Sequence, residues 1–216
     1  MKAFAIAALA ASLFATEAVA QDHLVPEESV IGGSEFSPGY HDLVSLVFAD
    51  AYKPNVRARV IVEQRSAPEA AVGISERDGQ WWLFSLEASE RIWPRPSRDV
   101  TARRYEIAID PELGQRIVAV WTAMLYGAHY DRPVQEREQE SVLVGNILHL
   151  HFSARVGGQI LAGGVTGPTD DSAPGLLAHV AGDIDDYCRA PNPDTRAALE
   201  RGVARLEARL LEERRR

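Results

Sequence analysis

The residues RRYEIAIDPELGQRIVAVWTAMLY, from Arg103 to Tyr126, contain two hydrophobic periods one after the other. Up to Ile109, apolar and polar side chains alternate, which is typical of a β-strand with one buried face. The segment Asp110–Glu112 then places a capping carboxylate, a first-turn proline and an acidic side chain in the order that favours a helix N-terminus. From there to Tyr126 the apolar residues recur at helical spacing. The stretch therefore predicts a strand that leads directly into a helix.

Two segments closer to the N-terminus also have strand character. Residues 43–48 (LVSLVF) form a compact apolar run, and residues 56–64 alternate between apolar and polar side chains. An antiparallel sheet with one solvated side produces this alternation. We therefore expect Arg57, Arg59 and Glu63, which share the polar side of the second segment, to face solvent.

Tryptophans indicate a candidate binding surface near the next strand, which is predicted over residues 80–87 after an Asp78-Gly79 turn signal. Trp82 and the apolar residues that alternate with it are expected to face the core. Trp81 would then lie on the opposite face, with Trp93 nearby in a proline-rich loop. An exposed pair such as Trp81 and Trp93 can bind sugars or a partner protein.

The C-terminal half reads as a hairpin followed by two helices. Gly157-Gly158 is a two-residue turn between strands predicted over residues 142–156 and 159–165, because such turns need positive φ angles. Helical spacing then predicts helices over residues 173–189 and 193–213. The second helix carries a regular apolar stripe that could pack between subunits. Its members are Leu199, Val203, Leu206 and Leu210.

These elements predict the α+β class, with an antiparallel sheet and helices packed on one of its faces. The order is strands, a helix, a hairpin and two helices, without the βαβ alternation of a parallel sheet. We divide the chain into residues 1–20, a loose N-terminal segment at 21–42, and a single α+β domain at 43–216 that ends in two helices.

The first of these segments, MKAFAIAALAASLFATEAVA, has the layout of a secretory signal peptide. Lys2 is followed by an apolar run of about thirteen residues, shorter than the ~20 that a membrane-spanning helix needs. Ala18-Val19-Ala20 offers small residues at a cleavage site. No cysteine stands there to accept a lipid anchor, and no later segment reaches membrane-spanning length. We expect a periplasmic or secreted protein.

Composition narrows the classes of function. The chain has 31 acidic and 23 basic residues, a net charge of −8, which argues against nucleic acid and anionic membranes as partners. Its single cysteine, Cys188, rules out an internal disulfide and fits a buried position in a helix. The nucleophile elbow, the P-loop, the dinucleotide fingerprint and the metalloprotease HExxH motif are all missing from the sequence.

His149 and His151 form the sharpest chemical motif. Residues two apart on a strand share a face, so both imidazoles could bind one metal ion, with His129 and Asp131 as further ligands. The alternative is that both histidines lie on the solvated face of the sheet, because Leu150 occupies the apolar face.

Three pieces of the chain carry a resemblance. They are IDPELGQRIVAVWTAMLYGAHY from Ile109, HLHFSARVGGQILAGGVTGP from His149, and the helix that contains Asp186-Tyr187. Together they resemble small exported proteins of Gram-negative bacteria that have no assigned function. The resemblance implies a small α+β exported domain, and it provides no catalytic residues that could be assigned to this chain.

The sequence therefore predicts an exported, non-enzymatic binding or interaction protein without a cofactor. We expect its partner to be an envelope protein or a small ligand, and the last helix offers a route to oligomers. The alternative function is a metal-dependent enzyme that uses the His-x-His strand pair.

Overall fold

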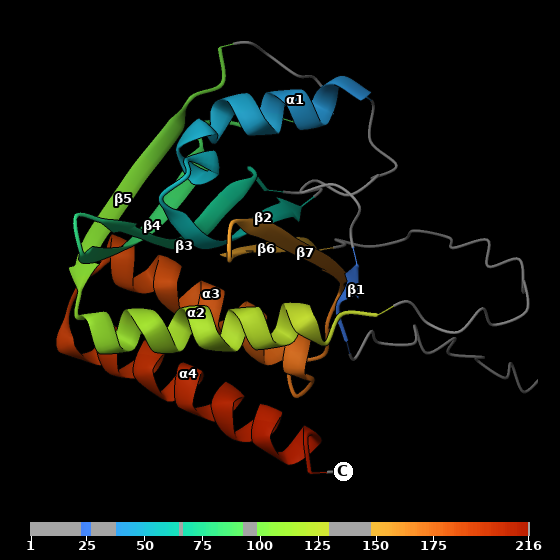
Figure 1. Ribbon diagram of the computed structural model, residues 1–216. Coiled ribbons are helices and arrows are strands. Elements are labelled where there is room, and N and C mark those ends of the chain that lie inside the picture. The colour runs from blue at the N-terminus through green and yellow to red at the C-terminus, as the bar shows by residue number, and fades with distance from the viewer. Residues whose placement is uncertain (1–22, 27–37, 65–66, 93–98, 130–147, 216) are drawn as a thin grey trace, which may run out of the picture.

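The computed structural model describes residues 23–26, 38–64, 67–92, 99–129 and 148–215 (Figure 1). The expected signal peptide, residues 142–147, Trp93 and Asp131 lie outside the described residues. The elements, in chain order, are β1 (Val25–Pro26), α1 (Pro38–Val47), the 3₁₀ helix η1 (Ala49–Tyr52), β2 (Val56–Gln64), β3 (Ala70–Arg77), β4 (Gln80–Ala88), β5 (Ala102–Ile109), α2 (Pro111–Tyr126), β6 (Leu148–Val156), β7 (Gln159–Thr166), α3 (Ala173–Arg189) and α4 (Pro193–Glu213).

The strands form one antiparallel sheet in the order β1-β7-β6-β2-β3-β4-β5. Both predicted hairpin turns are confirmed. Asp78 and Gly79 have φ angles of 53° and 77°, and Gly157 and Gly158 have 55° and 84°. Positive φ at both central residues defines the turn type whose twist matches that of the paired strands.

Helices α2 and α3 cover one face of this sheet, and α4 packs outside them (Figure 1). The predicted α+β class, with its antiparallel sheet and helix layer, is therefore confirmed. The Asp110 carboxylate accepts a hydrogen bond of 2.9 Å from the backbone N–H of Leu113, as the capping signal predicts. None of the helices in the described part of the chain is long and apolar enough to cross a membrane.

The apolar stripe of α4 packs within the chain. Leu199, Val203 and Leu206 are completely buried in the core between α4 and the helix layer. Burial of these side chains supplies the stability that a disulfide-free domain needs. The stripe is therefore not available to a second subunit, and the sequence-based reason for expecting an oligomer through this helix no longer holds.

Residues 43–47 belong to helix α1 and Phe48 to the turn that follows it, so the strand predicted over residues 43–48 is wrong. Tyr40, Val44 and Phe48 are spaced four residues apart and are all at least 99 % buried. A spacing of four places side chains on one side of a helix, whereas a strand would alternate them. The sequence does not show this period clearly, because Leu46 is also apolar although it lies on the opposite side of α1 and is 67 % exposed.

Helix α1 and η1 lie against the other face of the sheet and enclose a second apolar cluster with Phe84 and Leu86 (Figure 1). Strand β3 was not among the strands predicted from the sequence. Its side chains toward this face are small, since Ala71 and Gly73 alternate there, and a Cβ at Gly73 would lie 2.7 Å from the Phe84 ring. The segment at 21–42, expected to be loose, contributes β1 and the beginning of α1.

Candidate functional site

Polar side chains line the α1 face of the sheet along two neighbouring strands. Strand pairing places Arg59 opposite Ser153 and Glu63 opposite His149. His151 and Arg155 share the same face, because side chains two apart on a strand point the same way. We call these residues the polar row, and its members are Arg59 and Glu63 of β2 and His149, His151, Ser153 and Arg155 of β6.

Arg59 is the most firmly held member of the polar row. It is 94 % buried, its Nη1 donates a 2.6 Å hydrogen bond to the carbonyl of Ala51, and its guanidinium lies 3.8 Å from the centre of the Tyr52 ring. Burial lowers the Arg59 pKa, and the nearby charge of Arg155 lowers it further. A cation over an aromatic face is stabilised by the ring quadrupole, so Arg59 fastens η1 to the sheet.

A buried hydrogen-bonded group lies where α1 crosses this face. The Tyr40 hydroxyl donates to Glu69 Oε1 at 3.1 Å, and the backbone N–H of Ile92 donates to Glu69 Oε2 at 2.7 Å. Burial raises the pKa of Tyr40 above its ordinary value, with the charges of Glu63 and Glu69 adding to the effect. Tyr40 therefore stays protonated and acts as a hydrogen-bond donor that joins α1 to the loops below it.

Glu63 and His151 form a close pair beside this group. Their Oε2 and Nε2 atoms are 3.3 Å apart, and the Glu63 side chain is 2 % exposed. The expectation that Glu63 and His151 face solvent is wrong, because α1 covers this face of the sheet. Arg59 is buried because η1 covers it, while Arg57, at the irregularity in β2, is half-exposed and contacts Glu76.

The predicted metal ligands are only partly brought together. His149 and His151 share a face, and His149 Nδ1 lies 3.1 Å from the Thr166 hydroxyl. His129 instead stacks on His23, with ring centres 3.9 Å apart, beside β1 and so beyond β7 from the other two. Among the described residues, no three histidine, cysteine or acidic side chains form a metal-binding group.

The tryptophan prediction is corrected for Trp81. Its indole is 91 % buried on the helix face, against α2, where a Cβ at Gly114 would lie 2.7 Å from the ring. Trp82 lies on the α1 face, with the Arg77 guanidinium 4.6 Å from its ring centre. The two neighbours thus face the reverse of what was expected. Trp81 is part of the core, and Trp93 lies outside the described residues.

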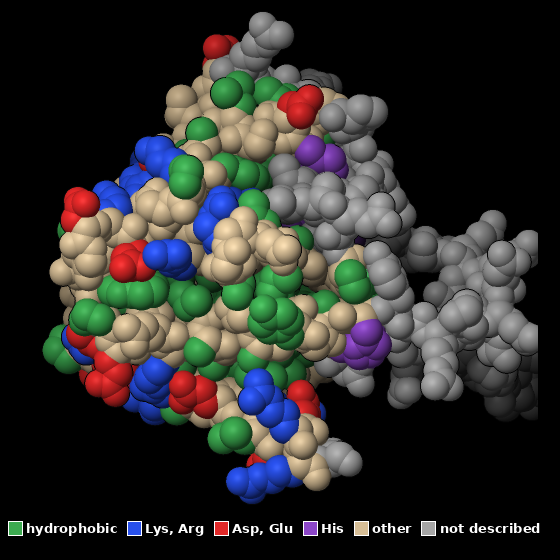
Figure 2. Space-filling view, viewed as in Figure 1, with side chains coloured by type: hydrophobic (Ala, Val, Ile, Leu, Met, Phe, Trp, Pro, Cys, Tyr) green, Lys and Arg blue, Asp and Glu red, His purple; other side chains and the backbone are tan. Residues whose placement is uncertain are grey.

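Two hollows open on the α1 face next to η1. The larger, the η1 hollow, has a volume of about 130 Å³. Its lining consists of Asp50, Lys53, Asn55, Val56, Ser75, Arg77, Phe84 and Arg104. Figure 2 shows Lys and Arg side chains grouped on this side of the molecule, between α1 and α2.

The charges around the η1 hollow do not cancel. Arg104 contacts Asp50 and Glu106, Arg77 contacts Glu106, and Lys53 contacts Asp50. Three cations thus share two carboxylates. The hydroxyl of Ser75 is buried and has no hydrogen-bond partner among the described residues. A hydrogen-bonding group held near a surplus positive charge is suited to an anionic oxygen.

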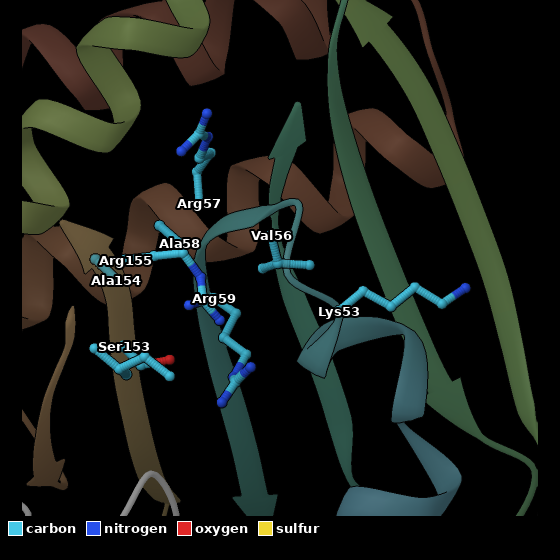
Figure 3. Close-up of a pocket in the computed structure, with 9 residues that line it drawn as sticks. Lys53, Val56, Arg57, Ala58, Arg59, Ser153, Ala154 and Arg155 are labelled. Atoms are coloured by element: carbon cyan, nitrogen blue, oxygen red, sulfur yellow. The ribbon is translucent and has the colours of Figure 1, made fainter. Parts of the chain in front are cut away.

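The smaller hollow, the arginine hollow, lies between β2 and β6 and has a volume of about 10 Å³ (Figure 3). Arg59 and Arg57 extend in opposite directions from β2, and Ser153 lies beside Arg59 on the neighbouring strand. The sequence showed these side chains as the polar side of an alternating strand. It held no sign that the face would be covered, so they were not singled out.

No known protein family, curated protein or solved structure matches this chain. The function is therefore inferred from the chemistry of these two hollows and from the N-terminal sequence.

Proposed function

We propose that the protein is exported to the periplasm and acts as a non-enzymatic binding protein that recognises an anionic group at the η1 hollow. The observation that carries this proposal is the set of three cations that share two carboxylates around the buried Ser75 hydroxyl. A surplus of one positive charge suits a carboxylate, which guanidinium groups bind through paired hydrogen bonds.

The size of the η1 hollow limits what it takes. Pockets that bury most of a drug-sized ligand measure roughly 300–1,000 Å³, whereas this hollow measures about 130 Å³. It therefore fits one acidic group, supplied by a small molecule or by a side chain of an envelope protein. The net charge of −8 makes a local basic hollow selective, because anions are repelled elsewhere on the surface.

Export is proposed from residues 1–20, whose layout is that of a cleavable leader. Expression of the full chain in a Gram-negative host, followed by fractionation and mass spectrometry, tests it. We expect the periplasmic fraction to contain a chain that begins at Gln21. Recovery of the uncleaved chain from the cytoplasm would contradict export.

Binding is tested by titrating the purified, isotope-labelled protein with acetate and with glutamate at constant ionic strength, using NMR. We expect saturable shifts of the backbone amides of residues 50–56, 75–77 and 104. Arg104→Gln should abolish them. Arg103→Gln is the matched control, because the Arg103 side chain points to the other face of the sheet and contacts the Tyr105 hydroxyl. Equal effects of the two substitutions would refute the η1 hollow as the site.

A further inference from the structure

Arg59 and Arg155 are neighbouring cations that contact no carboxylate of the described residues. Arg59 pairs with Ser153 across the strands, and Arg155 follows two residues later on the same face. Diagonal neighbours of this kind lie within reach of long side chains. Other arginines at the sheet do contact carboxylates: Arg57 contacts Glu76 at 2.7 Å, and Arg189 contacts two acidic side chains.

We propose that Arg59, Arg155 and Ser153 form a binding site for a dianionic oxyanion of the phosphate class. This goes beyond the proposed function, because the arginine hollow shares only Lys53 and Val56 with the η1 hollow and its charge calls for a different ligand. Two uncompensated guanidinium groups match two negative charges, and each can donate paired hydrogen bonds to anionic oxygens.

The arginine hollow is built before any ligand arrives. Arg59 is held by the Tyr52 ring and the Ala51 carbonyl, so its rotamer is fixed by contacts that an anion does not have to supply. The Nε atoms of both Arg59 and Arg155 are buried without a hydrogen-bond partner among the described residues. Buried donors without acceptors are rare in proteins, and a bound acceptor would satisfy them.

The like charges of Arg59 and Arg155 repel each other and destabilise the folded protein, because a guanidinium cannot lose its proton to relieve the repulsion. Repulsion by Arg155 contributes to the lowered pKa of Arg59. An anion between them turns this repulsion into two attractions. The buried Ser153 side chain lines the same hollow and adds a hydroxyl donor.

The dimensions of the hollow define how the ligand sits. A volume of about 10 Å³ holds about one water-sized group. The hollow therefore takes one oxygen of the oxyanion, and the rest of the ligand projects into solvent. This geometry suits inorganic phosphate or the terminal phosphate of a monoester, since both expose oxygens without bulky neighbours.

The experiment is an NMR titration of the purified protein with inorganic phosphate, sulfate, dimethyl phosphate and acetate at constant ionic strength, read at the backbone amides of residues 57–60 and 153–156. At a pH above the second pKa of phosphate, both phosphate and sulfate are dianions and should give saturable shifts there. The monoanions should bind at least ~10-fold more weakly, because one of the two charged contacts is then uncompensated.

Arg155→Gln should weaken phosphate binding by ~10-fold or more, and Arg155→Lys, which keeps the charge but loses the guanidinium fork, should weaken it less. Arg201→Gln on α4 is the control for net charge and should leave the affinity within about two-fold. Circular dichroism verifies that each variant is folded.

The proposal is overturned if Arg155→Gln binds phosphate as well as Arg201→Gln does, or if phosphate produces only unsaturated shifts spread over the surface. Acetate-induced shifts at residues 75–77 and 104, which do not line the arginine hollow, report on the η1 hollow alone. A failure of either proposal is therefore recognised without reference to the other.

Discussion

Two glycines of helix α3 allow the same substitution to be tested in opposite surroundings. Gly175 lies in the first turn, where the Ser172 hydroxyl caps the helix by accepting the Gly175 N–H at 3.1 Å. A Cβ at Gly175 would overlap the carbonyl oxygen of Thr169 and lie 2.8 Å from its carbonyl carbon. At Gly182, in the same helix, a Cβ would meet nothing within 4 Å.

The expected effects on the free energy of unfolding follow from these contacts. Gly182→Ala should stabilise the protein by ~1 kcal/mol, because alanine is the better helix former. Gly175→Ala gains at most the same amount. It also forces two carbons about 0.7 Å closer than the ~3.5 Å of a normal contact. Since the obstacle is backbone, overpacking should cost ~1–3 kcal/mol, and displacement of the cap ~1 kcal/mol more.

We therefore expect Gly175→Ala to be less stable than the parent protein by ~2 kcal/mol and to lose ~4–8 °C in Tm, and Gly182→Ala to gain ~2–4 °C. Urea titration and thermal melting, both followed by circular dichroism, measure these changes. The reasoning is refuted if Gly175→Ala is as stable as the parent protein, or if Gly182→Ala destabilises it.

Three further predictions concern the helix face. Burial and the charge of Asp186 raise the pKa of Asp183, so the stability that its protonated form contributes is lost as pH rises through that pKa. Asp183→Asn should therefore stabilise the protein at neutral pH. Urea titrations should show that this gain vanishes at about pH 3, where the carboxyl is protonated in the folded and the unfolded protein. Burial raises the Cys188 pKa to about 12, so a chromogenic disulfide at about pH 8 should react with the denatured protein only, and fast labelling of the native thiol would contradict this. Phe152→Ala should lower the free energy of unfolding by ~3–5 kcal/mol, because the ring is completely buried and meets the Trp121 ring edge-on with 5.6 Å between ring centres. Denaturant titration measures the change, and a loss well below ~3 kcal/mol would argue against this packing.

The sequence by itself determined the features that depend on neighbouring residues. The turns at Asp78-Gly79 and Gly157-Gly158 are set by backbone conformations that few residues adopt, and both are found where expected. The N-terminus of α2 follows from the Asp110 cap. Long helices with a regular apolar period, such as α4, were also identified, because their pattern repeats over several turns.

Only the tertiary structure decided which surfaces are buried. An alternating strand has two faces, and its pattern cannot show whether a helix covers the polar one. Helix α1 and η1 do so here, which buries Arg59, Glu63 and His151. For the same reason Trp81 and Trp82 were assigned to the wrong faces of the sheet, since elements pack on both faces and the alternation does not show which face each side chain meets. The placement of Arg59 diagonally to Arg155 depends on the register between β2 and β6, which is set by contacts between residues nearly a hundred positions apart.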